Sequence, residues 1–334
     1  MRTQQQHRLI SLHAPARLHL GFLDPAGTLG RRFGSLGLVI DGIETEIELA
    51  AAPSEDEWLA ADATAESELP RAARYLAQLR EHTGCLAPLR IELKRVLPPH
   101  AGFGSGTQLA LALGHAFARF HRLELSSLTL AHWLARGLRS GIGIAGFDQG
   151  GLLVDGGPGA DGRPAPLLSR IAFPEAWRVL VVQDARVRGL SGAQEKAAIA
   201  ALPPFPESLS ADICHQVLMR VLPGAASGEF EAFAAGVNRI QQLLGDHFAP
   251  AQGGSAYTSP AVEQAMQWLG EADAAIGQSS WGPTGFAIVP TPGLAEALAQ
   301  GLAGRLPPGL SVRVVRGLNR GARIADSTRL ASAA

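Results

Sequence analysis

A strand, a glycine-rich loop and a long apolar helix are predicted to follow one another between Leu89 and Phe120. The strand ends at Val96, the loop includes Gly102–Thr107, and the apolar helix begins at once. Glycine lets the backbone turn tightly and approach a ligand closely. The first turn of a helix also presents unpaired N–H groups and the positive end of the helix dipole. The segment therefore predicts an anion site for phosphate or diphosphate, or else a turn whose glycines serve packing alone.

The loop differs from two common nucleotide-binding patterns. No lysine follows its glycines, as one does in a Walker-type phosphate loop. The segment is also not a plain βαβ unit with an acidic residue at dinucleotide-binding spacing. The phosphate chemistry must therefore come from another arrangement.

Composition limits the class of protein. The chain has 334 residues, of which 46% are hydrophobic, so we expect two domains with well-filled cores. The net charge of −1 gives no electrostatic reason to expect nucleic acid or a membrane surface as partner. The first residues are polar, no apolar stretch approaches ~18 residues, and Cys85 and Cys214 form no metal or disulfide pattern. We expect a soluble cytoplasmic protein.

Hydrophobic periodicity and turn residues predict the secondary structure of both halves. Before a break near Pro174 we expect strands over residues 8–22, 36–40 and 44–49, a loop over 53–68 and a helix over 71–83. After the break we expect a buried strand from Trp177, several helices, a strand over 284–289, a helix over 294–302 and a strand over 310–316. This order predicts an α+β chain whose second half is ferredoxin-like.

Four further segments combine glycines with polar or charged residues. They begin at Ala14, Arg139, Arg188 and Gly277, and read APARLHLGFLD, RSGIGIAGFDQGG, RGLSGAQE and GQSSWGPTG. Together with the glycine loop, they resemble the motifs of the GHMP kinase superfamily, whose second motif has the form P-x-x-x-G-L-G-S-S-A. Here Phe103 and Gly106 replace the usual leucine and second serine. The replacements weaken the case for an ordinary ATP site.

In wording, the segments are most similar to one branch of that superfamily, the β-ribofuranosylaminobenzene 5′-phosphate synthases of methanopterin biosynthesis. The similarity covers about residues 12–325. It implies that residues 1–172 form a ribosomal protein S5 domain 2-like domain with the phosphate-binding loop. It also implies that residues 173–334 form a ferredoxin-like domain, with the pocket between the two, and it leaves room for a homodimer.

The same resemblance implies a synthase and not a kinase. Such an enzyme joins 4-aminobenzoate to phosphoribosyl diphosphate and releases carbon dioxide and diphosphate, with Mg²⁺ at the leaving group. The ring carbon that bears the carboxylate attacks the anomeric carbon, so we expect a para amino group to be essential and 4-hydroxybenzoate to react poorly. Two alternatives stay open: an ATP-dependent small-molecule kinase, and a sensor that kept the pocket without turnover.

Four residues are implied to act on the reacting groups: Arg17, Asp24, Arg139 and Asp148. Arg17 would contact phosphate, and Arg139 a phosphate or the carboxylate of the acid. Asp24 would hold Mg²⁺ together with Ser105, or bind the ribose hydroxyls. Asp148 stands where the kinases place a catalytic aspartate and would bind metal or ribose here. Surface or loop-bracing arginines and turn-capping aspartates are the structural alternatives.

Further residues are implied to bind substrate or phosphate. They are Gly102, Gly104, Ser105, Gly106 and Thr107 of the loop, and Arg188, Gln252, Ser279, Ser280 and Trp281. Ser105 and Thr107 would contact phosphate or cap the helix. Trp281 would stack on the aromatic ring or fill space between the domains. His19, a lone histidine on an alternating strand, is either part of the site or hydrogen-bonded structure.

Overall fold

The N-terminal part is built on a seven-stranded sheet. The computed structural model describes residues 6–159, 162–190, 192–305 and 307–330. The strands of this sheet are β1 (Gln6–Asp24), β2 (Phe33–Ala51), β3 (Glu57–Ala60), β4 (Leu89–Arg95), β5 (Leu152–Asp155), β6 (Leu167–Ile171) and β11 (Arg323–Leu330). Their order is β11-β1-β2-β4-β3, with β5 paired to both β2 and β6.

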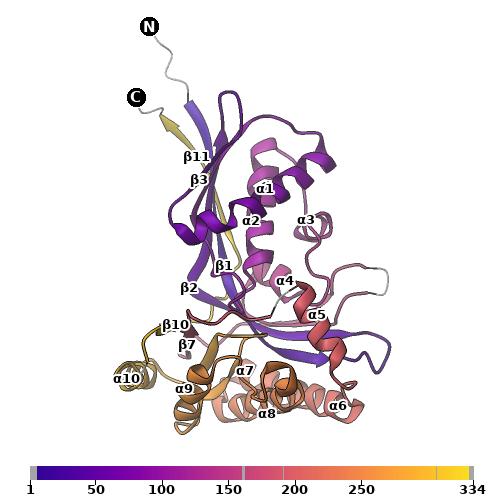
Figure 1. The fold of residues 1–334 in the computed structure, drawn as a ribbon, viewed down its shortest axis with the longest axis vertical. Helices are drawn as coiled ribbons and strands as arrows, with labels where there is room; N and C mark the ends of the chain where they lie inside the picture. Colours follow the sequence, from indigo (N-terminus) through magenta and orange to yellow (C-terminus); the bar gives the residue numbers. More distant parts are fainter. Residues whose placement is uncertain (1–5, 160–161, 191, 306, 331–334) are drawn as a thin grey trace.

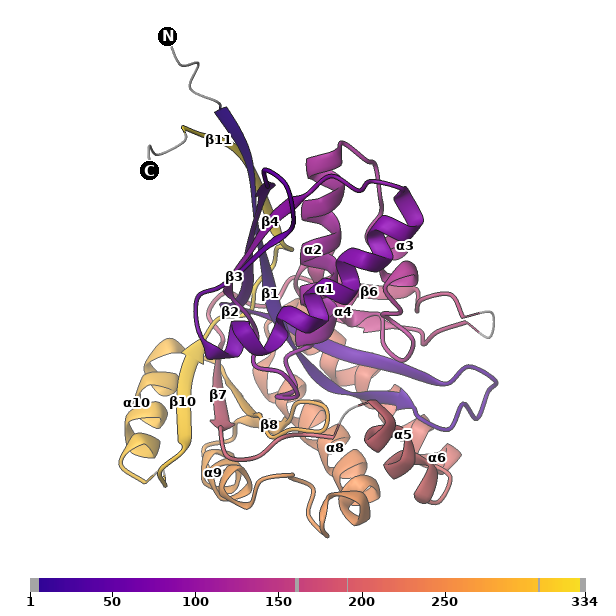
Figure 2. The ribbon, with the colours of Figure 1, turned by 45° about the horizontal axis from the view of Figure 1, so that its top comes forward.

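β1 and β2 are long strands that reach from this sheet down to the C-terminal helices (Figure 2). We expected two short strands with a turn at Asp41 and Gly42, but β2 is continuous there. Gly42 adopts a φ of +74° and its N–H donates to the Asp41 carboxylate at 2.9 Å. The two expected turn residues therefore lie within the strand. β1 changes its register against β2 between Pro15 and Arg17. Such irregularities re-aim neighbouring side chains.

Four helices cover one face of the first sheet. They are α1 (Ala63–Thr83), α2 (Ser105–His121), α3 (Ser127–Trp133) and α4 (Ile142–Gln149). α2 is the central helix, and its Leu109 and Leu113 lie in a core with Leu12 and Leu49 of the sheet. α1 begins earlier than expected, because the Asp62 carboxylate accepts from the Ala65 N–H at 2.8 Å and caps the helix.

The C-terminal part is a four-stranded sheet with helices on both faces. The strands, in the order β10-β7-β9-β8, are β7 (Arg178–Asp184), β8 (Ala275–Gln278), β9 (Gly285–Val289) and β10 (Leu310–Val315). The helical segments are α5 (Gly192–Ala201), α6 (Glu207–Gln216), η1 (Val217–Val221), α7 (Leu222–Ser227), α8 (Phe230–Phe248), η2 (Ala249–Gln252), α9 (Pro260–Gly270) and α10 (Pro292–Ala303). α9 and α10 pack on one face, and α8 fills the other. The predicted α+β, ferredoxin-like half is confirmed.

The two parts share a core, and the last strand of the chain joins the first sheet. Leu18 of β1, Ile240 of α8 and Phe286 of β9 belong to one buried cluster. β11 lies beyond the predicted boundary at residue 173, yet it pairs antiparallel with β1 in the first sheet, so the first and last described strands are neighbours (Figure 1). The boundary therefore needs correction for this strand. An edge strand of alternating pattern fits either sheet, so its sequence does not reveal its partner.

Among the helices in the described ranges, none has both the length and the apolar composition of a transmembrane span.

Candidate functional site

The glycine loop has the geometry expected of a tight packing turn and also that expected of an anion site. Gly102 and Gly104 adopt φ values of +84° and +78°, which side chains disfavour. A Cβ atom on Gly102 would lie 2.4 Å from the Ser279 carbonyl oxygen, so the loop packs tightly against the β8–β9 connection. Gly104 is the N-cap of α2, with no side-chain cap and no acidic residue in the first turn. The turn thus needs its glycines and also leaves a helix N-terminus open to an anion.

Five arginines surround this helix N-terminus, and we call the cavity they line the arginine pocket. Its volume is about 530 Å³. The arginines are Arg17 of β1, Arg71 and Arg74 of α1, and Arg136 and Arg139 of the loop before α4. Glu195 is the one carboxylate among the described residues that line it. Guanidinium groups bind phosphate as planar forks, so the pocket suits a polyanion with several phosphate groups.

Arg17 ties the arginine pocket to the glycine loop. Its Nη1 donates to the Gly102 carbonyl at 2.8 Å, while its Nε is buried without a partner. Desolvation lowers the pKa of Arg17 to about 10, against the opposing effect of Glu195 and Asp155. The guanidinium therefore stays charged at neutral pH and keeps an unused donor.

A chain of polar contacts crosses the arginine pocket. Arg139 Nη1 forms an ion pair with Glu195 Oε1 at 2.5 Å, and the indole N–H of Trp281 donates to the same oxygen at 2.8 Å. The Trp281 ring meets Phe248 edge-on, with centroids 5.2 Å apart. Trp281 thereby holds a fixed place between the charged pocket and an apolar one.

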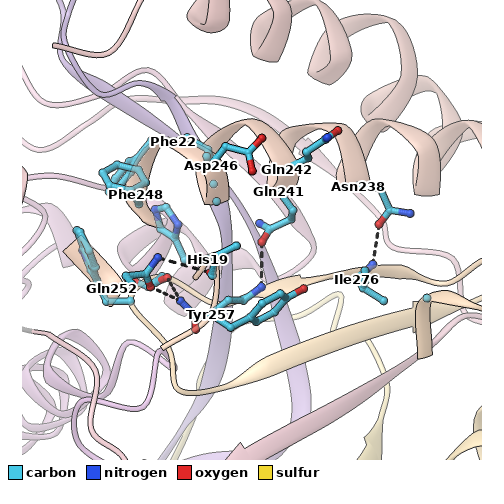
Figure 3. A pocket seen from close by; sticks show the side chains of 18 residues that line it. His19, Phe22, Asn238, Gln241, Gln242, Asp246, Phe248, Gln252, Tyr257 and Ile276 are labelled. Carbon is cyan, nitrogen blue, oxygen red and sulfur yellow. Dashed lines mark hydrogen bonds between the residues drawn. The ribbon is translucent and has the colours of Figure 1, made fainter. Parts of the chain in front are cut away.

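That second pocket, which we call the aromatic cavity, has a volume of about 420 Å³ and is shown in Figure 3. Aromatic side chains line it: Phe22, Phe248, Tyr257 and Trp281. Ser280 and Trp281 line both pockets, so the two adjoin there. A cavity of this size that combines aromatic walls with several polar side chains is typical of a small-molecule site.

His19 lies where the charged and apolar regions meet. It lines the aromatic cavity and also a third cavity of about 720 Å³, to which Arg17 and Arg139 contribute. The side chain is buried, its ring meets Phe22 at 4.5 Å, and its Nε2 has no partner. Burial, and then the charges of Arg17 and Arg139, lower the pKa of His19 to about 3. The imidazole is therefore neutral at physiological pH.

This depressed pKa predicts a pH-dependent loss of stability. Between about 6.5 and about 3, the unfolded state binds a proton at His19 that the folded state does not. The free energy of unfolding should therefore fall as pH drops below 6.5, by up to ~1.4 kcal/mol per pH unit from this residue. Urea unfolding between pH 6.5 and 4.5 should give a steeper decline for the wild type than for His19→Phe. Parallel declines would contradict the depressed pKa.

Asp24 and Asp148 do not line the three cavities described above. The Asp24 carboxylate accepts from the Gly27 N–H, from Thr28 and from Ser210. Burial would raise the pKa of Asp24, but these hydrogen bonds outweigh it and lower the pKa. The structure therefore shows Asp24 as a turn cap that lines none of the three cavities, whereas Ser105 lines the arginine pocket, and a shared metal ion stays a prediction.

Asp148 is exposed and braces helices. It accepts from the Ser127 hydroxyl at 2.5 Å, and that hydroxyl also lies 2.7 Å from Nε2 of His115. The buried carboxylate near the glycine turn is Asp155, which accepts from the Gly141 N–H at 2.7 Å. Desolvation raises the pKa of Asp155 despite such bonds. Asp148 thus lines none of the three cavities described above, and its role in binding metal or ribose stays a prediction.

Most of the other predicted residues line one of the pockets, and Ser279 and Arg188 do not. Gly102, Gly104, Ser105, Gly106 and Thr107 line the arginine pocket, and Gln252 lines the aromatic cavity. Ser279 is buried and its hydroxyl donates to the Gly102 carbonyl at 2.7 Å, which joins the loop to the β8–β9 connection. Arg188 is exposed and lines none of these cavities. The pKa of His100 is lowered mainly by burial, then by the charge of Arg71, and also by the charge of Arg188.

Several site residues were missed from the sequence. They are Arg71, Arg74, Arg136 and Glu195. Arg71 and Arg74, three residues apart, lie on one face of α1. That spacing was a usable signal, but nothing in the sequence brings α1 to the glycine loop. Glu195 stood inside a quoted segment without being singled out.

Comparisons with known proteins agree with this geometry. The family models for the GHMP kinase N-terminal and C-terminal domains match residues 69–152 and 221–307. A homoserine kinase structure from Cytophaga hutchinsonii has a TM-score of 0.69 at 17% identity, covering 95% of this chain and 97% of its own. A mevalonate diphosphate decarboxylase structure from Staphylococcus aureus has a TM-score of 0.66 at 13% identity, covering 96% and 98%. At such identities the likeness shows the fold alone.

Curated relatives are closer in sequence. A protein of Archaeoglobus fulgidus named beta-ribofuranosylphenol 5'-phosphate synthase is 33% identical over 84% of this chain and 88% of its own length. A protein of the same name from Methanothermobacter thermautotrophicus is 30% identical over 93% and 97%. These matches cover most of this chain and of each relative. The chain belongs to the beta-ribofuranosylphenol 5'-phosphate synthase family, within the GHMP kinase superfamily.

Proposed function

We propose that the protein transfers a 5-phosphoribosyl group from phosphoribosyl diphosphate to the ring carbon of a para-substituted benzoate, with release of carbon dioxide and diphosphate. The observation that carries the proposal is the junction at Ser280 and Trp281. There a pocket with five arginines meets a cavity lined by aromatic rings. A polyanionic sugar diphosphate and an aromatic acid are the two substrates such a pair of pockets suits.

The chemistry follows from the charges of the arginine pocket. The bond between the anomeric carbon and diphosphate oxygen breaks, and its electron pair leaves with diphosphate. Arg17, Arg139 and the N–H groups at the start of α2 would stabilise that charge. The ring carbon that bears the carboxylate then bonds to the anomeric carbon. Loss of carbon dioxide returns the electron pair of its bond to the ring, and no proton acceptor is required.

Mg²⁺ is proposed as the companion of diphosphate. Oxygen donors suit Mg²⁺, and the hydroxyls of Ser105 and Thr107 and the carboxylate of Glu195 line the arginine pocket. These residues would hold the ion, which would neutralise charge on the leaving group. Elsewhere in the described chain, His13, Glu44 and Glu46 lie within metal-binding reach of one another. Arg95 already forms ion pairs with both of these glutamates, so that cluster is a surface charge network.

The para substituent is the point on which the sequence and the relatives differ. The resemblance implied 4-aminobenzoate, whereas the relatives' name is that of a phenol. Loss of the carboxylate from 4-hydroxybenzoate leaves a phenol, so both acids enter the proposal. The expectation that 4-hydroxybenzoate reacts poorly is replaced by a direct comparison of the two.

A homodimer and a cytoplasmic location also stay predictions.

The kinase alternative is disfavoured by the surroundings of Gly106, which stands where the kinase motif has its second serine. A Cβ atom on Gly106 would lie 3.0 Å from Nη1 of Arg136. The guanidinium therefore lies close beside the helix N-terminus, and a serine side chain at position 106 would require it to shift by a few tenths of an ångström. Phe103, the other replacement, is fully buried in the shared core and does not line the pocket.

Serine at position 106 should weaken phosphoribosyl diphosphate binding. Gly106→Ser would push Arg136 away from the helix N-terminus, and the loss of one phosphate contact should raise KM for this substrate roughly 10-fold. Gly293→Ser is a matched control, because Gly293 also lies in the first turn of a helix and has open space at its Cβ. Equal kinetic constants for both variants would remove Arg136 from the site.

The proposal is tested by incubating the protein with Mg²⁺, phosphoribosyl diphosphate and each acid, and identifying the product by mass spectrometry. We expect a ribosyl 5-phosphate arene without the carboxylate. Thermal unfolding with Mg²⁺ should show a larger stabilisation by phosphoribosyl diphosphate than by ATP at equal concentration. A larger shift with ATP, with transfer of its phosphate to an alcohol, would favour the kinase instead.

A further inference from the structure

We propose that the aromatic cavity binds the ring of the benzoate and that His19 holds its carboxylate by a hydrogen bond from Nε2. This inference rests on the proposed function, because it assumes that the acid and the sugar diphosphate meet at the junction of the two pockets. The acid must present its carboxyl-bearing carbon to the anomeric carbon. Its carboxylate therefore lies at the junction, and its para substituent points into the cavity.

Most of the amide side chains on the cavity wall are already hydrogen-bonded, and the other polar side chains that line it include Gln242 and Asp246, which are exposed to solvent. The amide of Gln241 donates to the Leu20 carbonyl and accepts from the Gln278 N–H, and the amide of Asn238 pairs with Ala274 and Ile276 (Figure 3). The Gln278 and Gln252 side chains bond to each other. Within the described lining, the buried side-chain atom that has no hydrogen-bond partner is Nε2 of His19.

A buried polar atom without a partner costs stability, so its retention calls for a ligand. His19 is held in place from three sides: its backbone N–H donates to the Ser279 hydroxyl at 2.9 Å, its carbonyl accepts from the Ser280 N–H, and its ring meets Phe22. The ring is therefore oriented before any ligand arrives. Preorganised groups of this kind lose little entropy on binding.

A neutral imidazole suits a carboxylate that must leave. Carbon dioxide departs without charge, so the negative charge of the carboxylate passes to the ring during the reaction. A cation paired with the carboxylate would stabilise the ground state more than the transition state and would slow this step. His19 carries no charge at neutral pH, and with its proton on Nε2 it donates a single hydrogen bond. It can position the acid without stabilising the anion strongly.

The first test removes the hydrogen bond and keeps the ring. His19→Phe should weaken binding of 4-aminobenzoate and 4-hydroxybenzoate roughly 10-fold or more, as expected for a lost hydrogen bond to a charged group. His19→Gln, which keeps a donor, should retain most of the affinity. His121→Phe is the matched control, because His121 also has a buried Nε2 without a partner but lines none of these cavities.

Calorimetric titration of each acid into protein saturated with Mg²⁺ and diphosphate measures this affinity without turnover. In steady-state assays, KM for the acid should rise in His19→Phe while KM for phosphoribosyl diphosphate stays within about 2-fold, since one hydrogen bond is removed from one subsite only. Unchanged affinity for both acids, or a rise confined to KM for phosphoribosyl diphosphate, would overturn the inference.

A second variant tests the ring's place. Phe248→Ala removes a wall of the cavity, whereas Phe230→Ala, at the other end of α8, removes a ring packed on Trp177 outside it. Only the first should weaken binding of the acids. If the wild type binds both acids and His19→Phe does not, yet no product forms, the proposed function fails while the binding site stands. If product forms and neither His19→Phe nor Phe248→Ala alters acid binding, the function stands and this site is wrong.

Discussion

Replacing Arg17 with methionine is expected to lower kcat/KM for phosphoribosyl diphosphate by roughly 10²–10³-fold, the usual cost of removing one preorganised donor to developing charge. The reason is its position: it lines the arginine pocket, holds the Gly102 carbonyl at 2.8 Å and keeps Nε free. Steady-state kinetics with each substrate varied in turn would measure the loss.

Thermal unfolding controls for damage to the fold. Methionine reproduces the side chain from Cβ to the position of Nε and removes a charge whose burial depresses its own pKa, so the variant should stay folded. Arg90→Met is the matched control, because Arg90 is an exposed arginine of the first sheet with weak ion pairs to Glu57 and Glu92. Full activity in Arg17→Met would exclude this residue from catalysis.

The second large effect concerns the aromatic acid. A para substituent that donates electrons should be indispensable, because the carboxyl-bearing carbon attacks with the ring's electrons. We expect 4-aminobenzoate and 4-hydroxybenzoate to be the reactive acids, and benzoate to react more than ~10³-fold more slowly, a difference of about 4 kcal/mol in the barrier. Single-turnover assays with the three acids would measure this. Comparable rates for benzoate would exclude attack by the ring carbon.

Binding and reactivity must be separated in that comparison. Benzoate should still enter the aromatic cavity, because Phe22, Phe248 and Trp281, which line it, would contact the ring and not its substituent. Competitive inhibition by benzoate would show that it binds without reacting. A failure to inhibit would place the para substituent in recognition, with Tyr257 among the polar groups that line the cavity.

Local features were the ones that the sequence predicted well. The glycine loop, its helix and the ferredoxin-like half follow from periodicity and turn residues, which act over short stretches. Gly102 and Gly104 were placed correctly because their backbone conformation is a local demand. The segments that resemble the family then located Arg17, Arg139 and Trp281 at one site.

What depends on long-range packing could not be read in this way. Arg71 reaches the site because α1 packs beside α2, and β11 joins the first sheet across more than 300 residues of chain. Ser105 was considered as a cap, yet Gly104 takes that role because its φ of +78° begins the helix one residue earlier. Asp148 was placed by analogy with the kinases, and only the packing of α3 against α4 shows its carboxylate on Ser127.

One measurement tests the central claim most directly. The protein is incubated with Mg²⁺, phosphoribosyl diphosphate and carboxyl-labelled 4-aminobenzoate or 4-hydroxybenzoate, and labelled carbon dioxide and diphosphate are both measured. The account predicts that the two products appear in equal amounts, since each new bond to the anomeric carbon releases one of each. Diphosphate without carbon dioxide would indicate hydrolysis or attack through the para substituent, and would contradict the account.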